Sequence, residues 1–304
     1  MNAADIKVEK LTVNIGAEVS GVDLSQPLDQ PSIDVIKKAF HDHQVIFFRD
    51  QPLSYEQQIR FGRYFGDLYV HPMAAVTAAA KLEAVVSAEA NVADAAKPIA
   101  YASPLAEYPE IIKIYADEKS VQAAGETWHA DVTSEPEPPM GSILRLDELP
   151  SVGGDTLFCS MYAAYEALSK PMQKFLSTLT AIHDGQKFYA NRSAFDSSKK
   201  YQRSEHPVIR THPVTGRQAL YVHTTLTTRI LQLSQSESDA LLAFLYRHAE
   251  TPLFHCRWKW TKNSIAFWDN RCTLHQAQWD YFPQRRVGYR VQVNGDRPFY
   301  RSEA

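Results

Sequence analysis

The 304-residue sequence predicts a mainly β fold with flanking helices. Short segments rich in β-branched and aromatic residues recur between turn signals such as PSVGGD (150–155). Segments with helical periodicity are few, and they do not alternate with the strands as they would in a doubly wound fold. Both observations favour a β-sandwich or barrel decorated by helices, and residues 1–304 are expected to form a single domain.

Hydrophobic periodicity places the expected elements along the chain. Strands are predicted within residues 11–24, 44–48, 111–116, 141–149, 218–222, 263–269 and 287–293. Helices are predicted over 31–43, 54–66, 163–179 and 236–250. Two serines mark helix starts: Ser54, and Ser236 with Asp239 three residues further on.

Residues 74–100 differ from the rest of the chain because they are rich in alanine and contain no aromatic residue. A helical surface excursion or a partly ordered loop is the ordinary explanation for such an insertion. Long insertions beside functional residues also act as lids. The sequence therefore predicts a lid-like insertion here.

Composition excludes several classes of protein. The chain has 32 Lys and Arg against 35 Asp and Glu, with no basic run, so neither nucleic acid nor an anionic membrane is an expected partner. Cys159, Cys256 and Cys272 form neither a zinc pattern nor a disulfide framework. The N-terminus is charged where a signal peptide would be apolar, and no apolar stretch is long enough to span a bilayer. A cytoplasmic protein is the expectation.

The segment ETWHADVTS places His129 and Asp131 two residues apart. Residues at i and i+2 of a strand point to one face, so this imidazole and carboxylate can converge on one ion. Two histidines with one carboxylate leave open positions on a metal, which is the arrangement of non-haem Fe(II) oxygenases. Among 11 histidines and 35 acidic residues, roughly one such spacing is expected by chance. A second match, His248 with Glu250, falls in a predicted helix, where the two side chains diverge.

Further support lies in the C-terminal third, where His275 is followed by Arg286 and Arg290. If RVGYRVQV is a strand, the even separation places both arginines on one face. An arginine binds a carboxylate through two parallel hydrogen bonds, so two such residues near a metal suggest two bound anions. Two surface arginines remain the alternative on spacing alone.

These motifs resemble those of the taurine dioxygenase and 2,4-dichlorophenoxyacetate dioxygenase family. The resemblance runs from GAEVSGVDL (16–24) to GDRPFYR (295–301) and is strongest in WHADVT (128–133), LPSVGGDTLF (149–158), HPVIRTHPVTGRQALYV (206–222) and WDNRCTLHQAQWDYFPQRR (268–286). It implies a double-stranded β-helix, or jelly roll, and a dioxygenase that uses Fe(II), 2-oxoglutarate and O2. Transferred by position, His129, Asp131 and His275 would bind iron, and Arg286 and Thr156 would bind 2-oxoglutarate.

The resemblance also implies an anionic substrate. His71 and Arg290 match residues that hold the anionic head of taurine, and Val132 is a further candidate for substrate binding. The positions that bind the amine of taurine are occupied here by Ala74 and Gly125, which offer no side-chain hydrogen bond. A buried ammonium group would be left unpaired there, which is strongly unfavourable. Taurine itself is therefore not the expected substrate.

The expected reaction is hydroxylation of a C–H bond in an alkylsulfonate or alkyl sulfate ester, with release of succinate and CO2. The same chemistry on an aryloxyalkanoate or another carboxylate stays open, as do desaturation, cyclisation and isonitrile formation. A metal-binding jelly roll that acts as a sensor is the non-enzymatic alternative, and the co-substrate clamp at Arg286 distinguishes the two. A homo-oligomer, either a dimer or a tetramer, is also expected.

Overall fold

The computed structural model describes residues 3–71, 102–121, 123–189 and 200–302. Its strands are β1 (Lys7–Lys10), β2 (Ala17–Ser20), β3 (Val45–Phe48), β4 (Ala102–Pro104), β5 (Ile111–Ala116), β6 (Gly141–Glu148), β7 (Thr156–Ser160), β8 (Thr180–Asp184), β9 (Arg203–Pro207), β10 (Ile209–Thr211), β11 (Gln218–Leu220), β12 (Thr227–Ile230), β13 (His255–Trp258), β14 (Ile265–Asp269), β15 (Thr273–Ala277) and β16 (Arg286–Val293). Its helices are η1 (Ala3–Asp5), α1 (Gln30–His43), α2 (Tyr55–Arg63), α4 (Met161–Glu166), α5 (Lys170–Leu176), α6 (Gly185–Tyr189), α7 (Gln235–Ala249) and η2 (Pro252–Phe254). The predicted mainly β fold with helices is confirmed.

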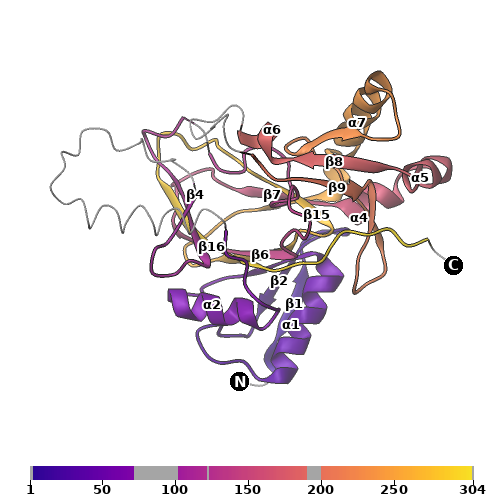
Figure 1. Ribbon diagram of the computed structural model, residues 1–304. Coiled ribbons are helices and arrows are strands. Elements are labelled where there is room, and N and C mark those ends of the chain that lie inside the picture. The colour runs from indigo at the N-terminus through magenta and orange to yellow at the C-terminus, as the bar shows by residue number, and fades with distance from the viewer. Residues whose placement is uncertain (1–2, 72–101, 122, 190–199, 303–304) are drawn as a thin grey trace.

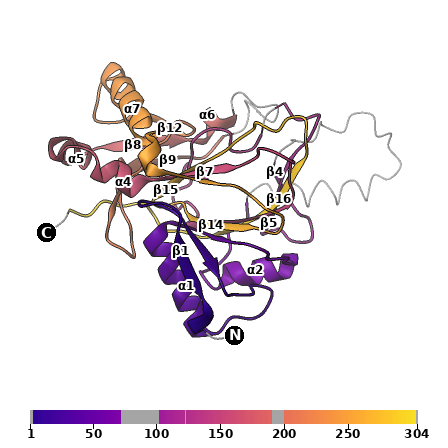
Figure 2. The same ribbon diagram turned by 180° about the vertical axis from the view of Figure 1, so that it is seen from behind.

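The strands form one large sheet and several small ones. The large sheet has the order β1-β2-β3-β14-β6-β16-β5-β4, and the smaller groups are β13-β7-β15, β12-β8-β9 and β10-β11. Phe47 and Leu144 of the large sheet pack against Phe158 and Trp258 of β7 and β13. Figures 1 and 2 show this second layer of strands on the side of the large sheet away from α1 and α2. A core of buried side chains therefore fills the space between the two layers.

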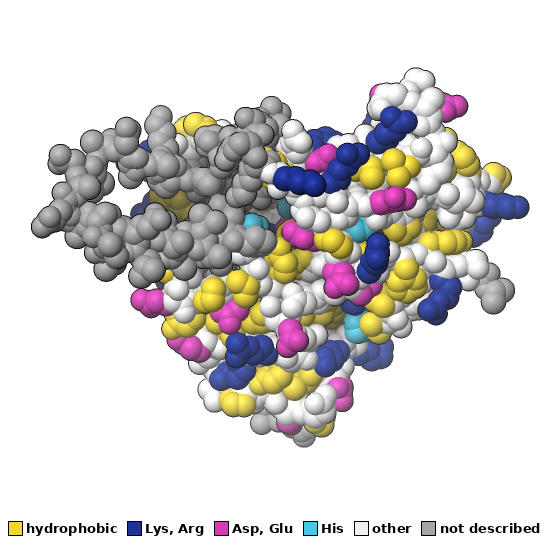
Figure 3. All heavy atoms as spheres, in the orientation of Figure 1, with side chains coloured by type: hydrophobic (Ala, Val, Ile, Leu, Met, Phe, Trp, Pro, Cys, Tyr) yellow, Lys and Arg dark blue, Asp and Glu magenta, His cyan; other side chains and the backbone are white. Residues whose placement is uncertain are grey.

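Two helices cover the outer face of the large sheet. Phe40 of α1 stacks on Phe267 of β14 at a ring distance of 4.0 Å, and Phe61 of α2 meets the same ring edge-on. The other helices, α4, α5 and α7, contribute to a separate core with β8 and β15. In the part of the chain that the structure describes, every helix is too short or too polar to cross a membrane. Side chains of both charge signs are interspersed on the face shown in Figure 3.

Two of the expected helices differ from the structure. Residues 163–179 form two helices and not one, because Ser169 accepts a hydrogen bond from the backbone of Met172 and so begins α5, with Pro171 in its first turn. The helix expected at 236–250 begins at Gln235, and its N-cap is Ser234, two residues before the expected Ser236; the side chain of Ser234 forms a capping box with Glu237. The start at Ser236 was therefore wrong, whereas the start at Ser54 is confirmed.

The remaining differences concern the N-terminal segment and the insertion. Within residues 11–24 only Ala17–Ser20 is a strand, and its partner Lys7–Lys10 precedes the expected range. The predicted lid-like insertion at 74–100 lies outside the described residues.

Candidate metal and co-substrate site

Three side chains with metal-binding atoms converge between the sheets. His275 lies in β15, and its backbone exchanges two hydrogen bonds with that of His129, with N···O distances of 2.8 and 3.1 Å. Asp131 follows at the start of a turn. The ligand atoms of the three residues all lie within 4.8 Å of one another. The strand spacing assumed for His129 and Asp131 is wrong, because His129 forms only an isolated bridge and Asp131 lies in a turn; the two side chains converge through the turn instead.

The geometry of the three side chains fits a metal ion. Nε2 of His129 lies 3.7 Å and Nε2 of His275 lies 3.9 Å from Oδ1 of Asp131. Nδ1 of His129 is 2.8 Å from the carbonyl of Thr127, which can only accept, so this nitrogen donates and Nε2 is the ring nitrogen that faces Asp131. Burial, reinforced by His129, holds the pKa of His275 well below its usual value, so this ring is neutral. Two imidazoles and a carboxylate are the donor set that non-haem Fe(II) prefers.

The two oxygens of the Asp131 carboxylate have different partners. Oδ2 accepts a hydrogen bond of 2.7 Å from the Ser142 hydroxyl, and Oδ1 accepts one of 2.7 Å from Nη1 of Arg290. Burial raises the pKa of Asp131, but the Arg290 guanidinium and the hydrogen bond from Ser142 outweigh it and hold the pKa below its usual range. Asp131 is therefore a carboxylate with Oδ1 turned towards the histidines.

Arg286 lies in a second polar group, which joins β16 to β7. Its Nε donates to the carbonyl of Gly154 at 3.1 Å and its Nη2 donates to the Thr156 hydroxyl at 3.4 Å. The same hydroxyl accepts a hydrogen bond of 3.0 Å from the Trp260 indole. Because both lone pairs of the Thr156 oxygen are engaged, its own proton remains available for an acceptor. Thr156 and Arg286 are thus brought together, as the resemblance implied.

The charge of Arg286 is buried without an opposite charge. Its side chain is 5% exposed, and within the described residues no carboxylate oxygen lies within 4.0 Å of it. Burial lowers the pKa of Arg286, although the guanidinium remains charged. A buried cation that lacks an anion is strongly unfavourable, so the position suits a ligand that brings a carboxylate.

Arg286 and Arg290 both reach into the space between the sheets, as their even separation predicts. The register of β16 against β6 shifts between Val287 and Gly288, and the extra residue, Asp147, belongs to β6. The alternation of side chains along β16 is therefore uninterrupted.

The remaining predicted residues are less well placed. His71 is half-buried at the end of a described segment, with its ring edge-on to Tyr69 at a ring distance of 6.2 Å. Val132 is half-buried in the turn after Asp131, at a backbone φ of 54°. Ala74 lies outside the described residues. Roles of His71 and Val132 in substrate binding stay predictions.

Gly125 lies directly against the ring of His129. A Cβ atom at Gly125 would lie 2.9 Å from Cε1 of His129, and the backbone φ of Gly125 is +79°. We expect Gly125→Ala to displace the His129 ring and to weaken Mn(II) binding about tenfold or more, the range in which disturbed support of a metal ligand falls. Titration of Mn(II) in the presence of 2-oxoglutarate measures the change.

Gly216 offers a matched control, because its φ is +72° and nothing lies within 4 Å of its hypothetical Cβ atom. Gly216→Ala carries the same backbone penalty, roughly 1–2 kcal/mol, without touching a ligand. Equal Mn(II) affinities in the two variants would show that the contact with His129 is unimportant.

A second group of metal-binding residue types, His212, Asp269 and Cys272, is already satisfied by protein contacts. Arg271 binds Asp269 through two hydrogen bonds of 2.8 and 2.6 Å. Nδ1 of His212 accepts from two backbone N–H groups of the following turn, so its Nε2 donates to Asp269 at 3.0 Å. No nitrogen lone pair of His212 remains for a metal, and the group is a structural ion-pair network.

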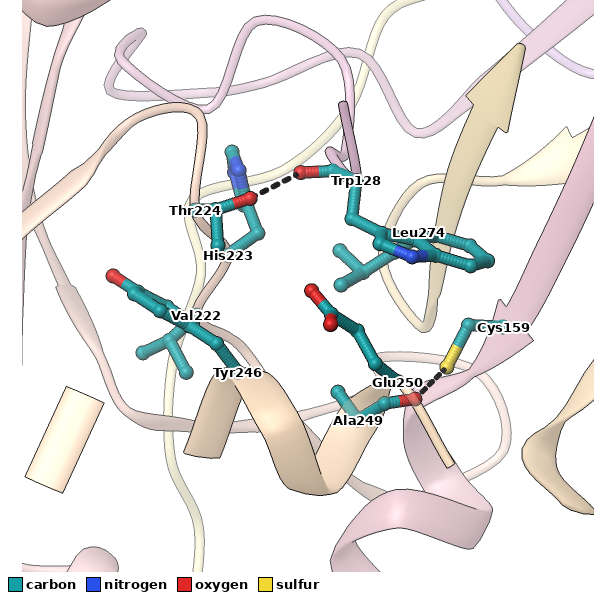
Figure 4. A pocket seen from close by; sticks show the side chains of 9 residues that line it. All are labelled: Trp128, Cys159, Val222, His223, Thr224, Tyr246, Ala249, Glu250 and Leu274. Atoms are coloured by element: carbon teal, nitrogen blue, oxygen red, sulfur yellow. Dashed lines mark hydrogen bonds between the residues drawn. The ribbon is translucent and has the colours of Figure 1, made fainter. Parts of the chain in front are cut away.

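A small cavity of about 10 Å³ lies behind the two histidines. Figure 4 shows Trp128 and Leu274 on one side of it and Tyr246 and Glu250 on the other. Trp128 and Leu274 directly precede His129 and His275, and neighbouring side chains of an extended segment point to opposite faces. The cavity has the size of one water molecule and lies on the far face of these segments, so it is not the substrate site.

Polar residues that support Asp131 are not among those predicted from the sequence. Asn270 accepts from the backbone N–H of Asp131 at 3.2 Å and donates to Ser142 at 3.0 Å. Both Ser142 and Asn270 are at most 2% exposed. A serine beside the apolar residues Ile143 and Leu144 of a predicted strand was the available signal, because buried polar groups require partners.

Comparison with known proteins agrees with this fold and site. Residues 7–292 match the family described as Taurine catabolism dioxygenase TauD, TfdA family. The chain is 32% identical to the alpha-ketoglutarate-dependent sulfonate dioxygenase of Saccharomyces cerevisiae over 98% of its length and 69% of the yeast protein. It is 31% identical to the alpha-ketoglutarate-dependent sulfate ester dioxygenase of Pseudomonas putida, over 98% of this chain and 92% of that one. The crystal structure of a taurine dioxygenase from Burkholderia xenovorans superposes with a TM-score of 0.76 at 33% identity, covering 97% of this chain and 92% of the other.

The fold and site define a jelly-roll dioxygenase that depends on alpha-ketoglutarate, that is, 2-oxoglutarate. The chain belongs to the TauD, TfdA family. It is an oxidoreductase that uses Fe(II), 2-oxoglutarate and O2.

Proposed function

We propose that the enzyme hydroxylates a C–H bond of a small organic anion, an alkylsulfonate or an alkyl sulfate ester, and that taurine is a poor substrate. His129, Asp131 and His275 hold Fe(II) in this proposal. Arg286 and Thr156 hold the distal carboxylate of 2-oxoglutarate. Arg290 and His71 bind the anionic head of the substrate, and Val132 is a further substrate-binding residue.

The buried guanidinium of Arg286 carries the proposal. It has only neutral hydrogen-bond partners, Gly154 and Thr156, within the described residues. An incoming carboxylate supplies the missing negative charge and accepts the free proton of Thr156. A protein that only binds a metal has no use for this arrangement, which supports an enzyme with an anionic co-substrate.

Arg290 supports the choice of an anionic substrate. Its side chain is 13% exposed, and its guanidinium adjoins the carboxylate oxygen that faces the histidines. Its Nε is buried with no hydrogen-bond partner, so one donor remains for another anion. A sulfonate or sulfate has three oxygens to accept such a donor. Anchoring the anion here holds the adjacent carbon near the three ligand atoms.

Gly125 supports the argument against taurine. It has no side chain, and a Cβ atom there would collide with His129. A hydrogen-bond partner for an ammonium group therefore cannot be introduced at this position without moving a ligand. The names of the sulfonate and sulfate ester dioxygenases among the relatives agree with an anion that carries sulfur.

Fe(II), 2-oxoglutarate and O2 together supply the oxidation, with succinate and CO2 as co-products. One oxygen atom enters the C–H bond beside the sulfur group, and the other enters succinate. The hydroxylated sulfonate then expels sulfite and leaves an aldehyde, whereas a hydroxylated sulfate ester expels sulfate. The residues of the chain bind and orient; none has to remove a proton from carbon.

Succinate formation tests the proposal. With Fe(II), 2-oxoglutarate and O2 present, we expect a linear alkylsulfonate or alkyl sulfate ester to stimulate succinate release well above taurine or an aryloxyalkanoate. Sulfite or sulfate should appear in a 1:1 ratio with succinate. Greatest stimulation by taurine, or none by either sulfur class, would contradict the assignment.

Three further expectations stay predictions: the single domain over residues 1–304, the cytoplasmic location and the homo-oligomer. Light scattering after size-exclusion chromatography distinguishes a monomer from a dimer or tetramer.

A further inference from the structure

The turn that follows His129 is under backbone strain. Val132 has a φ of 54°, a left-handed conformation that is rare for a β-branched residue. Such a conformation costs roughly 1–3 kcal/mol and persists only where the surroundings impose it. Because Val132 separates Asp131 from Thr133, whatever holds Thr133 also sets the direction of the Asp131 carboxylate.

Thr133 is held by two buried histidines. Its Oγ1 lies 2.8 Å from Nδ1 of His183 and 2.8 Å from Nε2 of His223. Thr133 and His183 are fully buried, and His223 is 2% exposed. Burial lowers the pKa of both histidines, so each neutral ring offers one donor and one acceptor. The two rings lie at hydrogen-bonding distance from the same hydroxyl and together hold the Thr133 side chain in one orientation.

A third histidine holds the backbone of the same turn. Nε2 of His206 lies 2.9 Å from the carbonyl of Thr133 and 3.1 Å from that of Glu135, and both oxygens can only accept. His183 comes from β8 and His206 from β9, which are neighbours in one small sheet (Figure 1). His183, His206 and His223, which we call the histidine cluster, therefore fix both the side chain and the main chain at position 133.

We propose that Thr133 and the histidine cluster are positioning residues that hold the strained turn and thereby aim Asp131 at the metal. The inference rests on the proposed role of Asp131 as an iron ligand. An alternative is that the cluster is only a buried polar part of the core. The alternatives differ in one respect: loss of a positioning contact weakens metal binding, whereas loss of a purely structural one lowers stability alone.

Thr133→Val separates them, because it removes the hydroxyl and keeps the branched shape. We expect the Kd for Mn(II), titrated in the presence of 2-oxoglutarate, to rise about 10- to 100-fold in this variant. Thr133→Ser keeps the hydroxyl and should keep an affinity close to that of the wild type. Equal affinities for Mn(II) in both variants and in the wild type would overturn the proposal.

Thr211→Val is the matched control for stability. Thr211 is 4% exposed, and its hydroxyl accepts from the backbone N–H of Arg301 at 2.8 Å, so the substitution also removes a hydrogen bond of a buried threonine. It should lower the Tm without changing the Kd for Mn(II). If Thr133→Val lowers the Tm to a similar extent and leaves the Kd unchanged, the cluster only stabilises the fold.

A second pair of variants decides the matter if Thr133→Val does not fold. His223→Gln places an amide where Nε2 lies, whereas His223→Leu offers no hydrogen bond. We expect weaker Mn(II) binding in the leucine variant than in the glutamine variant, and equal binding in the two would overturn the proposal. His275→Ala tests the proposed iron site separately. Unchanged Mn(II) binding in that variant would refute the site itself, whatever the other variants show.

Discussion

Asp131→Asn is expected to reduce turnover to background and to weaken Mn(II) binding. The loss of affinity should exceed about 100-fold, which is the upper end for the loss of a contact that only supports a metal ligand. The substitution keeps the shape of the side chain and still allows Ser142 to donate a hydrogen bond to it. It removes the negative charge that faces Nε2 of His129 and of His275. A neutral amide is a poor ligand for Fe(II), so the measurement is metal affinity by titration alongside succinate formation.

The same substitution should lower stability, because it leaves the guanidinium of Arg290 without its carboxylate at 2.7 Å. Breaking a buried ion pair on one side costs about 3–5 kcal/mol. The double variant Asp131→Asn with Arg290→Gln should recover most of this loss but not the metal binding. A double variant as unstable as Asp131→Asn alone would show that the pair with Arg290 is not the cause.

The stability difference should also depend on pH. The pKa of Asp131 is lowered in the folded protein, so the unfolded chain takes up the proton first as pH falls. The contribution of the ion pair is therefore complete above the unfolded pKa of about 4 and is lost progressively below it. Wild type and Asp131→Asn should converge in stability at low pH, which acid titration of both proteins without metal would test.

The strands could be predicted because their residues are β-branched, aromatic and bounded by turns, as at Ile111–Ala116 and Ile265–Asp269. Helix boundaries were harder, since Ser234 and Ser236 both precede an apolar run and only the position of Glu237 decides between them. The break at Ser169 had a local signal in the following Lys-Pro, but helical periodicity continued through it.

The residues proposed to bind the metal and the co-substrate could be predicted from the sequence, whereas the residues that support them could not. His129, Asp131, His275 and Arg286 came from motifs and family resemblance, and the structure brings them into two adjoining groups. Their supporting residues could not be found from the sequence. Thr133 meets histidines 50 and 90 residues away, and such contacts follow from the sheet topology alone. The left-handed backbone of Val132 also has no local signal, because valine is the wrong residue for it.

Arg286→Met is expected to raise the KM for 2-oxoglutarate at least about 30-fold, the equivalent of ~2 kcal/mol for a lost buried charge pair. The methionine fills a similar volume but cannot bind a carboxylate, and Thr156 alone remains to do so. Thermal shifts give an independent measurement. 2-Oxoglutarate with Mn(II) should raise the Tm of the wild type, and the rise should be smaller in the variant because the ligand binds it less tightly.

Without ligand, the same variant should be no less stable than the wild type. Arg286 is a buried charge with neutral partners, and replacing such a group with an apolar side chain is neutral or stabilising. Arg210 is the matched control, since it is 1% exposed but paired with Asp296 at 2.7 Å. Arg210→Met should lower the Tm and leave the KM for 2-oxoglutarate unchanged. If the two variants had the same effects on the Tm and on the KM for 2-oxoglutarate, Arg286 would be a structural residue. Its buried charge would then not bind 2-oxoglutarate.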